Sequence, residues 1–188
     1  MSERLEVEVK SRKALRAWLS KHHAQPDSVW MVHHKKVSSH YVPMGELVSE
    51  LLCWGWVDSV SRGVDETRTS HLIAPRNPKS AWSAVNKAKV EEARAAGLMT
   101  DAGEAAIAVA QKNGMWSFLD DVERLEVPDD LNEALGPLRE VWDAYPRNVK
   151  RGTLEWLKTA KTAPTRQKRI AGITTNARAQ KRPPPFER

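Results

Sequence analysis

The hydrophobic pattern of this 188-residue chain changes near residue 75, and that change limits the fold class more than any other feature. Before it, short apolar stretches typical of β-strands alternate with stretches of helical periodicity. Beyond it, only helical periodicity continues. We therefore predict an α+β fold, in which a small mixed sheet with packed helices is followed by a helical C-terminal module.

Four strands are expected in the first part of the chain. Residues 5–9 (LEVEV) alternate apolar and polar side chains, which indicates a half-buried strand. Residues 28–32 (SVWMV) are continuously apolar, as in a central strand. Residues 56–60 and 66–73 have the composition of a strand pair joined by a turn that contains Gly63.

Capping residues place the expected helices. Ser11 is suited to the N-cap of one helix, and Pro43 opens another. A third helix is expected from Ser80 to Ala96, followed by a glycine in the usual stop position. Thr100 caps the next helix, which ends at an Asn-Gly pair.

These elements predict three segments. Residues 1–126 form an α+β domain with two helices at its end, and residues 127–182 form a helical C-terminal module. Residues 183–188 belong to a proline-rich, frayed tail.

The stretch CWGWVDS, residues 53–59, places a glycine between two tryptophans at the end of an expected helix. Gly55 is predicted to adopt a positive φ there, because glycine does so without a steric penalty. Trp54 and Trp56 are expected to pack into the core at this helix-to-strand corner. An indole N–H needs a hydrogen-bond acceptor when it is buried, and Asp58 is a candidate for that acceptor.

The chain gives little indication of catalysis or of membrane insertion. It contains no apolar run of the roughly 20 residues that a membrane helix needs. Its N-terminus lacks the apolar core of a secretory signal, and Cys53 is its single cysteine, so a cytoplasmic location is expected. No catalytic motif or metal-binding spacing is present, and neither a catalytic residue nor a cofactor is predicted. The six histidines include the adjacent pair His33 and His34, which point to opposite faces of a strand.

Several motifs together resemble the YdeI/OmpD-associated, or bacteriocin-protection, family. The resemblance rests on CWGWVDS and on APRNPKSAWSAVNKAKVEEARAAGLMTDAG, residues 74–103. Residues 28–36, 125–131 and 153–170 are similar to further family segments, so the resemblance extends over nearly the whole chain. It implies a role in resistance to bacteriocins or cationic antimicrobial peptides and an association with an outer-membrane porin. It implies no reaction and no catalytic residue.

One candidate site surrounds residues 75–82 (PRNPKSAW). Two cations precede an expected helix N-terminus there, and free N–H groups at such a terminus favour an anion. A capped helix with solvated basic side chains explains the same pattern. The candidate ligand-binding residues are Lys35, Trp56, Asp58, Arg76, Lys79, Ser80 and Trp82.

A second candidate site lies in residues 161–182, which contain no Asp or Glu. A basic helix of this kind can contact a polyanion such as nucleic acid, although it can also be a solubilising surface. The candidate polyanion-binding residues are Lys161, Arg166, Lys168 and Arg169.

Three functions are consistent with these features. The first is a non-enzymatic binding or protective protein in the response to antimicrobial peptides, with an anionic ligand or a peptide as its partner. A cationic peptide would need an acidic surface, which is offered by Asp129, Asp130, Glu133, Glu140 and Asp143. The second is a nucleic-acid or phosphate-ligand binding protein that uses residues 76–82 and 161–182. The third is an enzyme that acts on a small anionic substrate in a pocket lined by Trp56, Asp58 and Arg76.

Overall fold

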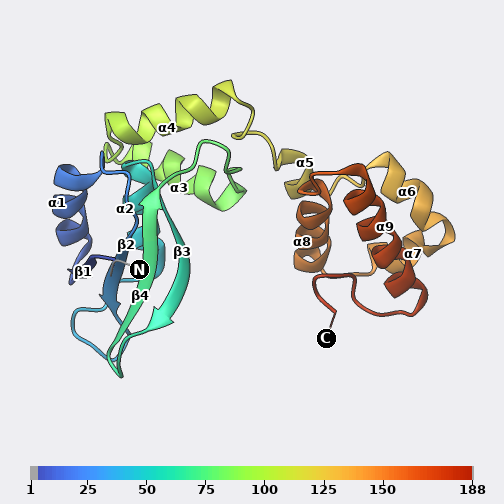
Figure 1. The fold of residues 1–188 in the computed structure, drawn as a ribbon, viewed down its shortest axis with the longest axis horizontal. Coiled ribbons are helices and arrows are strands. Elements are labelled where there is room, and N and C mark those ends of the chain that lie inside the picture. The colour runs from blue at the N-terminus through green and yellow to red at the C-terminus, as the bar shows by residue number, and fades with distance from the viewer. Residues whose placement is uncertain (1–3, 188) are drawn as a thin grey trace. The chain divides into compact units, whose positions relative to one another are not determined.

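The computed structural model describes residues 4–187, and the chain divides into two compact units (Figure 1). The first unit is Met1–Phe118, and the second is Leu119–Arg188. All four strands belong to the first unit, and the second is helical. The predicted α+β class is therefore confirmed. Among residues 4–187, no helix combines the length and the apolar character needed to cross a membrane.

A mixed four-stranded sheet forms one layer of the first unit, with the strand order β1-β2-β4-β3. β1 pairs in parallel with β2, whereas β2 with β4 and β3 with β4 are antiparallel. A bulge interrupts the β3–β4 ladder between Asp58 and Ser61. The strands are β1 (Glu6–Val9), β2 (Val29–His34), β3 (Trp56–Gly63) and β4 (Arg68–Pro75).

Four helices complete the first unit, and two apolar clusters hold them in place. In the first cluster, Leu15 and Leu19 of one helix and Leu47 and Leu51 of another pack on sheet residues that include Met31. The second cluster joins α2, α3 and α4 through Leu52, Trp82, Val90, Ile107 and Ala110. The helices are α1 (Arg12–His22), α2 (Met44–Cys53), α3 (Ala84–Ala95) and α4 (Asp101–Lys112).

The corner between α2 and β3 has the predicted form. Gly55 has a φ of 70°, and a Cβ added to it would lie 3.0 Å from both the Ala102 carbonyl oxygen and the Ala106 Cβ. Trp56 is buried, and its Nε1 donates to the His23 carbonyl oxygen (2.9 Å). Trp54 is only half-buried, and its Nε1 donates to Glu50 Oε1 (3.0 Å). The suggestion that Asp58 accepts an indole hydrogen bond is wrong, because both indoles have other acceptors.

The second unit is built from helices around an apolar centre that includes Leu131, Trp142, Leu157 and Ile173. The sequence pattern placed the boundary between segments near residue 126. In the structure α5 packs on α8, and the Lys158 ammonium lies 2.5 Å from the Asp121 carboxylate, so residues 119–126 belong to the second unit. The helices are α5 (Asp120–Glu123), α6 (Asp129–Leu135), η1 (Gly136–Leu138), α7 (Arg139–Asp143), α8 (Arg147–Lys158) and α9 (Ala163–Arg178).

Candidate functional site

The helix expected to begin at Ser80 begins at Ala84, and Ser83 is its N-cap. Ser83 Oγ accepts a hydrogen bond from the backbone N–H of Asn86 (3.3 Å). The backbone N–H of Ser80 instead donates to the Asn77 carbonyl oxygen (2.9 Å), and that of Trp82 donates to the Met115 carbonyl oxygen (3.0 Å). These two donors are therefore used within the protein, and the prediction of a helix N-terminus at Ser80 that could bind an anion is wrong.

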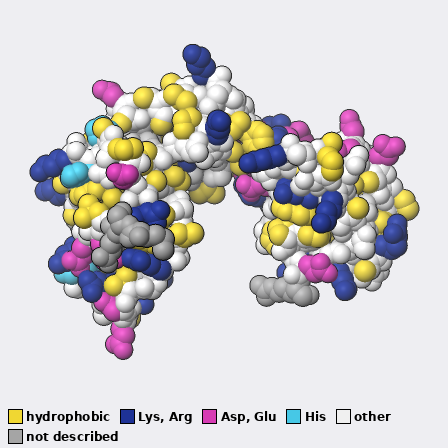
Figure 2. All heavy atoms as spheres, viewed as in Figure 1, with side chains coloured by type: hydrophobic (Ala, Val, Ile, Leu, Met, Phe, Trp, Pro, Cys, Tyr) yellow, Lys and Arg dark blue, Asp and Glu magenta, His cyan; other side chains and the backbone are white. Residues whose placement is uncertain are grey.

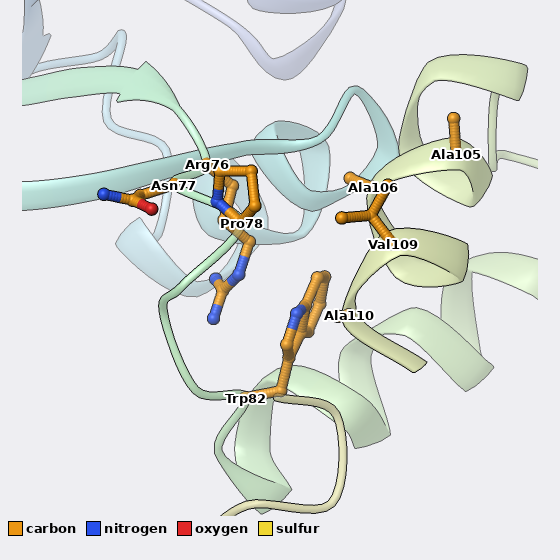
Figure 3. A pocket seen from close by; sticks show the side chains of 8 residues that line it. All are labelled: Arg76, Asn77, Pro78, Trp82, Ala105, Ala106, Val109 and Ala110. Carbon is orange, nitrogen blue, oxygen red and sulfur yellow. The ribbon is translucent and has the colours of Figure 1, made fainter. Parts of the chain in front are cut away.

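Residues 76–82 form a loop before α3, and this loop fixes the position of the Arg76 side chain. The backbone N–H of Arg76 donates to the Gly55 carbonyl oxygen (2.9 Å), which ties the loop to the corner between α2 and β3. Arg76 Nη2 donates to the Ala81 carbonyl oxygen (2.6 Å). The guanidinium carbon lies 3.9 Å from the centre of the Trp82 ring, as expected for a cation–π contact. Figure 3 shows the guanidinium beside this indole.

The guanidinium of Arg76 is partly removed from water. Its Nε and Nη1 atoms are buried, and among the described residues neither has a hydrogen-bond partner. Burial lowers the pKa of Arg76 to about 10, so the group still carries its charge at neutral pH. Buried donors without acceptors cost free energy, and a nearby anion would compensate that cost.

A cavity of about 200 Å³ adjoins this side chain. One wall is α4, which contributes small apolar side chains, as Figure 3 shows. Trp82 lines the cavity but is only 1% exposed, because it also packs into the second apolar cluster. On the face drawn in Figure 2, hydrophobic side chains gather over α4, where Val109 is 46% exposed. The lining residues are Arg76, Asn77, Pro78, Trp82, Ala105, Ala106, Val109 and Ala110.

The structure brings together only two of the predicted ligand-binding residues, Arg76 and Trp82. Lys35 follows β2, and its Nζ donates to the Asp65 carbonyl oxygen (2.7 Å). The strand register places Lys35 at the end of the sheet away from Arg76, since His34 pairs with Arg68 and Val29 pairs with Ile73. Trp56, Asp58, Lys79 and Ser80 do not line the cavity. Arg76 was expected to share a pocket with Trp56 and Asp58, but neither of these two residues lines the cavity beside it.

The α4 wall of the cavity was not among the predicted binding residues. Ala105, Ala106, Val109 and Ala110 recur at helical spacing, so they share one face of α4. A stripe of small residues is common in closely packed helices, so the pattern alone does not distinguish a cavity wall from a helix contact.

The basic segment of the second unit is partly neutralised by its surroundings. Arg166 Nε and Nη2 donate to the two Asp130 carboxylate oxygens (2.6 and 2.8 Å), which raises the pKa of Arg166. Arg169 Nη1 donates to the Trp156 carbonyl oxygen, and its guanidinium carbon lies 4.7 Å from the centre of the Trp156 ring. Lys161 and Lys168 are exposed. Figure 2 shows acidic and basic side chains intermixed on this unit.

Three histidines of the sheet and His40, in the turn after β2, form two separate contacts. His33 Nε2 and His71 Nδ1 lie 2.9 Å apart and share a hydrogen bond. His34 Nε2 lies 3.3 Å from Glu8 Oε1, and the His34 and His40 rings are 5.3 Å apart. His33 and His34 thus point to opposite faces, as predicted. Within residues 4–187, no three His, Cys, Asp or Glu side chains converge in a way that could hold a metal ion.

Comparison with known proteins finds two matching families, one in each unit. Residues 7–106 match a family described as a domain of unknown function (DUF8412). Residues 124–180 match the family described as Bacteriocin-protection, YdeI or OmpD-Associated. The resemblance to that family is thus confirmed for a part of the chain, whereas residues 53–59 and 74–103 lie in the DUF8412 match.

Searches of curated proteins and of solved structures gave no match. The DUF8412 match covers more than half of the 188 residues. The protein therefore belongs to the DUF8412 family, and residues 124–180 of its second unit are similar to the Bacteriocin-protection, YdeI or OmpD-Associated family.

Proposed function

We propose that this protein is a non-enzymatic binding protein whose first unit holds a small anionic ligand beside Arg76. One observation carries the proposal: the buried Nε and Nη1 atoms of Arg76 have no acceptor among residues 4–187, at the edge of a mainly apolar cavity. A ligand oxygen at this position would accept a charge-assisted hydrogen bond, which is stronger than a bond between neutral groups.

The composition of the cavity supports binding rather than catalysis. Among the described residues that line it, Arg76 is the one with an ionisable side chain. Acid–base or nucleophilic catalysis requires a group that can accept a proton or attack the substrate near neutral pH. A guanidinium with a pKa of about 10 remains protonated and is suited to hold an anion in place.

The match of residues 124–180 supports a protective role for the whole chain, and we extend the proposal to resistance against antimicrobial peptides. Direct capture of a cationic peptide by the acidic residues of the second unit has less support. Asp130 is paired with Arg166, and Asp143 lies 3.0 Å from Arg139. We place the protein in the cytoplasm, which is compatible with the free, buried thiol of Cys53. Cell fractionation tests this location, and recovery mainly from the periplasm would contradict it.

Calorimetric titration of the full chain with small anions tests the binding proposal. Arg76→Met keeps most of the side-chain volume and removes the charge, so anion binding should be lost. Lys79→Met is the matched control, because Lys79 is exposed on the same loop and does not line the cavity. Equal loss in both variants would contradict the assignment of the site to Arg76.

A survival assay tests the protective role separately. Cells that lack the protein should become more sensitive to cationic peptides, and the unaltered chain should restore their resistance. If Arg76→Met restores resistance as well as the unaltered chain does, ligand binding at this cavity is not needed for protection.

A further inference from the structure

We propose that the ligand beside Arg76 is a monocarboxylate attached to one compact apolar group, about the size of a benzene ring. This inference rests on the proposed function, because it names the chemical class of the anion that the cavity would hold.

The charge of the site favours a single carboxylate over a phosphate. Of the described residues that line the cavity, Arg76 is the one cation, and Lys79 is exposed outside the lining. Phosphate sites commonly combine side-chain cations with free backbone N–H groups. Here the N–H of Lys79 donates to Asn77 Oδ1 (2.9 Å), and those of Ser80 and Trp82 donate to carbonyl oxygens. These three backbone donors are therefore used within the protein, which leaves fewer N–H groups for a dianion than a typical phosphate site offers.

The free donors of Arg76 suit a carboxylate. Nη2 donates to the Ala81 carbonyl oxygen, whereas the buried Nε and Nη1 have no acceptor in the described part of the chain. An ionised carboxylate only accepts hydrogen bonds, so it could satisfy these donors without bringing a donor of its own into the cavity.

The size and the walls of the cavity favour an apolar group on that carboxylate. An apolar cavity of about 150 Å³ is large enough for benzene, and the volume here is about 200 Å³. Three alanines and a valine of α4 form one wall, and the Trp82 indole contributes to the opposite side, as Figure 3 shows. Such surfaces stabilise an aromatic or branched aliphatic group by excluding water from it.

Titration calorimetry with four probes separates these requirements. Benzoate carries both the charge and the ring, benzamide keeps the ring without the charge, acetate keeps the charge without the ring, and inorganic phosphate tests the other anion class. Benzoate should bind at least about tenfold more tightly than benzamide, because the contact with Arg76 is charge-assisted. It should also bind at least about tenfold more tightly than acetate, because of the buried ring.

Two variants on α4 confirm the location without changing Arg76. Ala105 is exposed and lines the cavity, so Ala105→Leu should fill part of the space and weaken benzoate binding. Ala108→Leu is the matched control, since Ala108 is exposed on the same helix outside the lining, and it should leave benzoate binding unchanged. Both variants keep the loop intact, so they stay informative if Arg76→Met does not fold.

The outcomes distinguish this inference from the proposed function. If phosphate binding requires Arg76 and benzoate does not bind, the inference of a carboxylate ligand is overturned, whereas the proposed anion site is supported. Equal affinity for acetate and benzoate would overturn the inference that the ligand carries an apolar group. If none of the anions binds to the folded protein, both proposals are overturned. Benzoate binding that Ala105→Leu and Ala108→Leu affect equally would also overturn this inference.

Discussion

Replacing Gly103 by alanine tests how closely α4 approaches the end of α2. A Cβ added to Gly103 would lie 2.3 Å from the carbonyl oxygen of Cys53 and 2.7 Å from its carbonyl carbon. These are backbone atoms, so rotation of a side chain cannot relieve the overlap. The same carbonyl oxygen accepts hydrogen bonds from Thr100, at 3.2 Å from its backbone N and 2.6 Å from its Oγ1.

The expected effect is opposite to that of a usual glycine-to-alanine change in a helix. Helix propensity alone would stabilise the variant by about 1 kcal/mol. Overpacking typically costs about 1–3 kcal/mol, and weakening the Thr100 hydrogen bonds adds about 1 kcal/mol. The net result should be a loss of about 1–3 kcal/mol in the free energy of unfolding.

Urea denaturation of the full chain measures this loss, and hydrogen exchange of peptides from α2 and α4 assigns it to the first unit. Gly45→Ala in α2 is the matched control, because its Cβ would meet only Lys89 Nζ, at 3.4 Å, on a flexible side chain. This control should be neutral or stabilising by up to about 1 kcal/mol. A Gly103→Ala variant as stable as the unaltered protein would refute the close approach of the two helices.

Three further results are expected. Trp56→Ala should cost about 3–5 kcal/mol in urea denaturation, because it empties a buried site in the first cluster and leaves the His23 carbonyl oxygen without its donor. Burial first, and then the neighbouring His71, hold the pKa of His33 below its usual 6.5. Below pH 6.5 the unfolded chain therefore takes up a proton at His33 that the folded state excludes. The free energy of unfolding should decrease as the pH is lowered from 6.5 to the folded pKa, and His33→Gln should reduce this decrease. Arg166→Glu should lower the melting temperature, because it breaks the pair with Asp130. Lys168→Glu changes an exposed position, so its free energy of unfolding should stay within about 0.5 kcal/mol of that of the unaltered protein. Loss of heparin retention in Lys168→Glu would favour the polyanion hypothesis for the second unit.

Local patterns in the sequence were sufficient to predict most of the elements. Ser11 and Thr100 cap helices as expected, since their side chains accept from N–H groups three residues later. The strand pair around Gly63 is present, and Gly55 and Gly97 have positive φ where helices end. In each case a single residue type satisfies a backbone requirement within a few positions, and the sequence alone shows that requirement.

The features that could not be predicted depend on contacts between distant residues. Ser80 and Ser83 are both of a residue type that favours the N-cap, and the structure uses Ser83, while the Trp82 N–H before it donates to the distant Met115 carbonyl oxygen. Glu50 is buried although charged, because Arg12 and Arg16 from α1 each approach its carboxylate to 2.8 Å. Neither partner could be assigned before the fold was known.

Arg76 shows how a candidate residue can be found for the wrong physical reason. The sequence pointed to it through a helix N-terminus, whose dipole and free N–H groups would attract an anion. In the structure the helix begins at Ala84, and Arg76 lies in the loop before it. The attraction for an anion depends on a guanidinium that is stacked on Trp82, partly desolvated and incompletely hydrogen-bonded.

The two explanations for anion binding predict that different residues are needed. A helix-terminus site would depend on Ser80 and Lys79, whereas the cavity depends on Trp82 and on the small side chains of α4. Since filling the cavity from Ala105 leaves the start of α3 unchanged, loss of anion binding in that variant would decide between them.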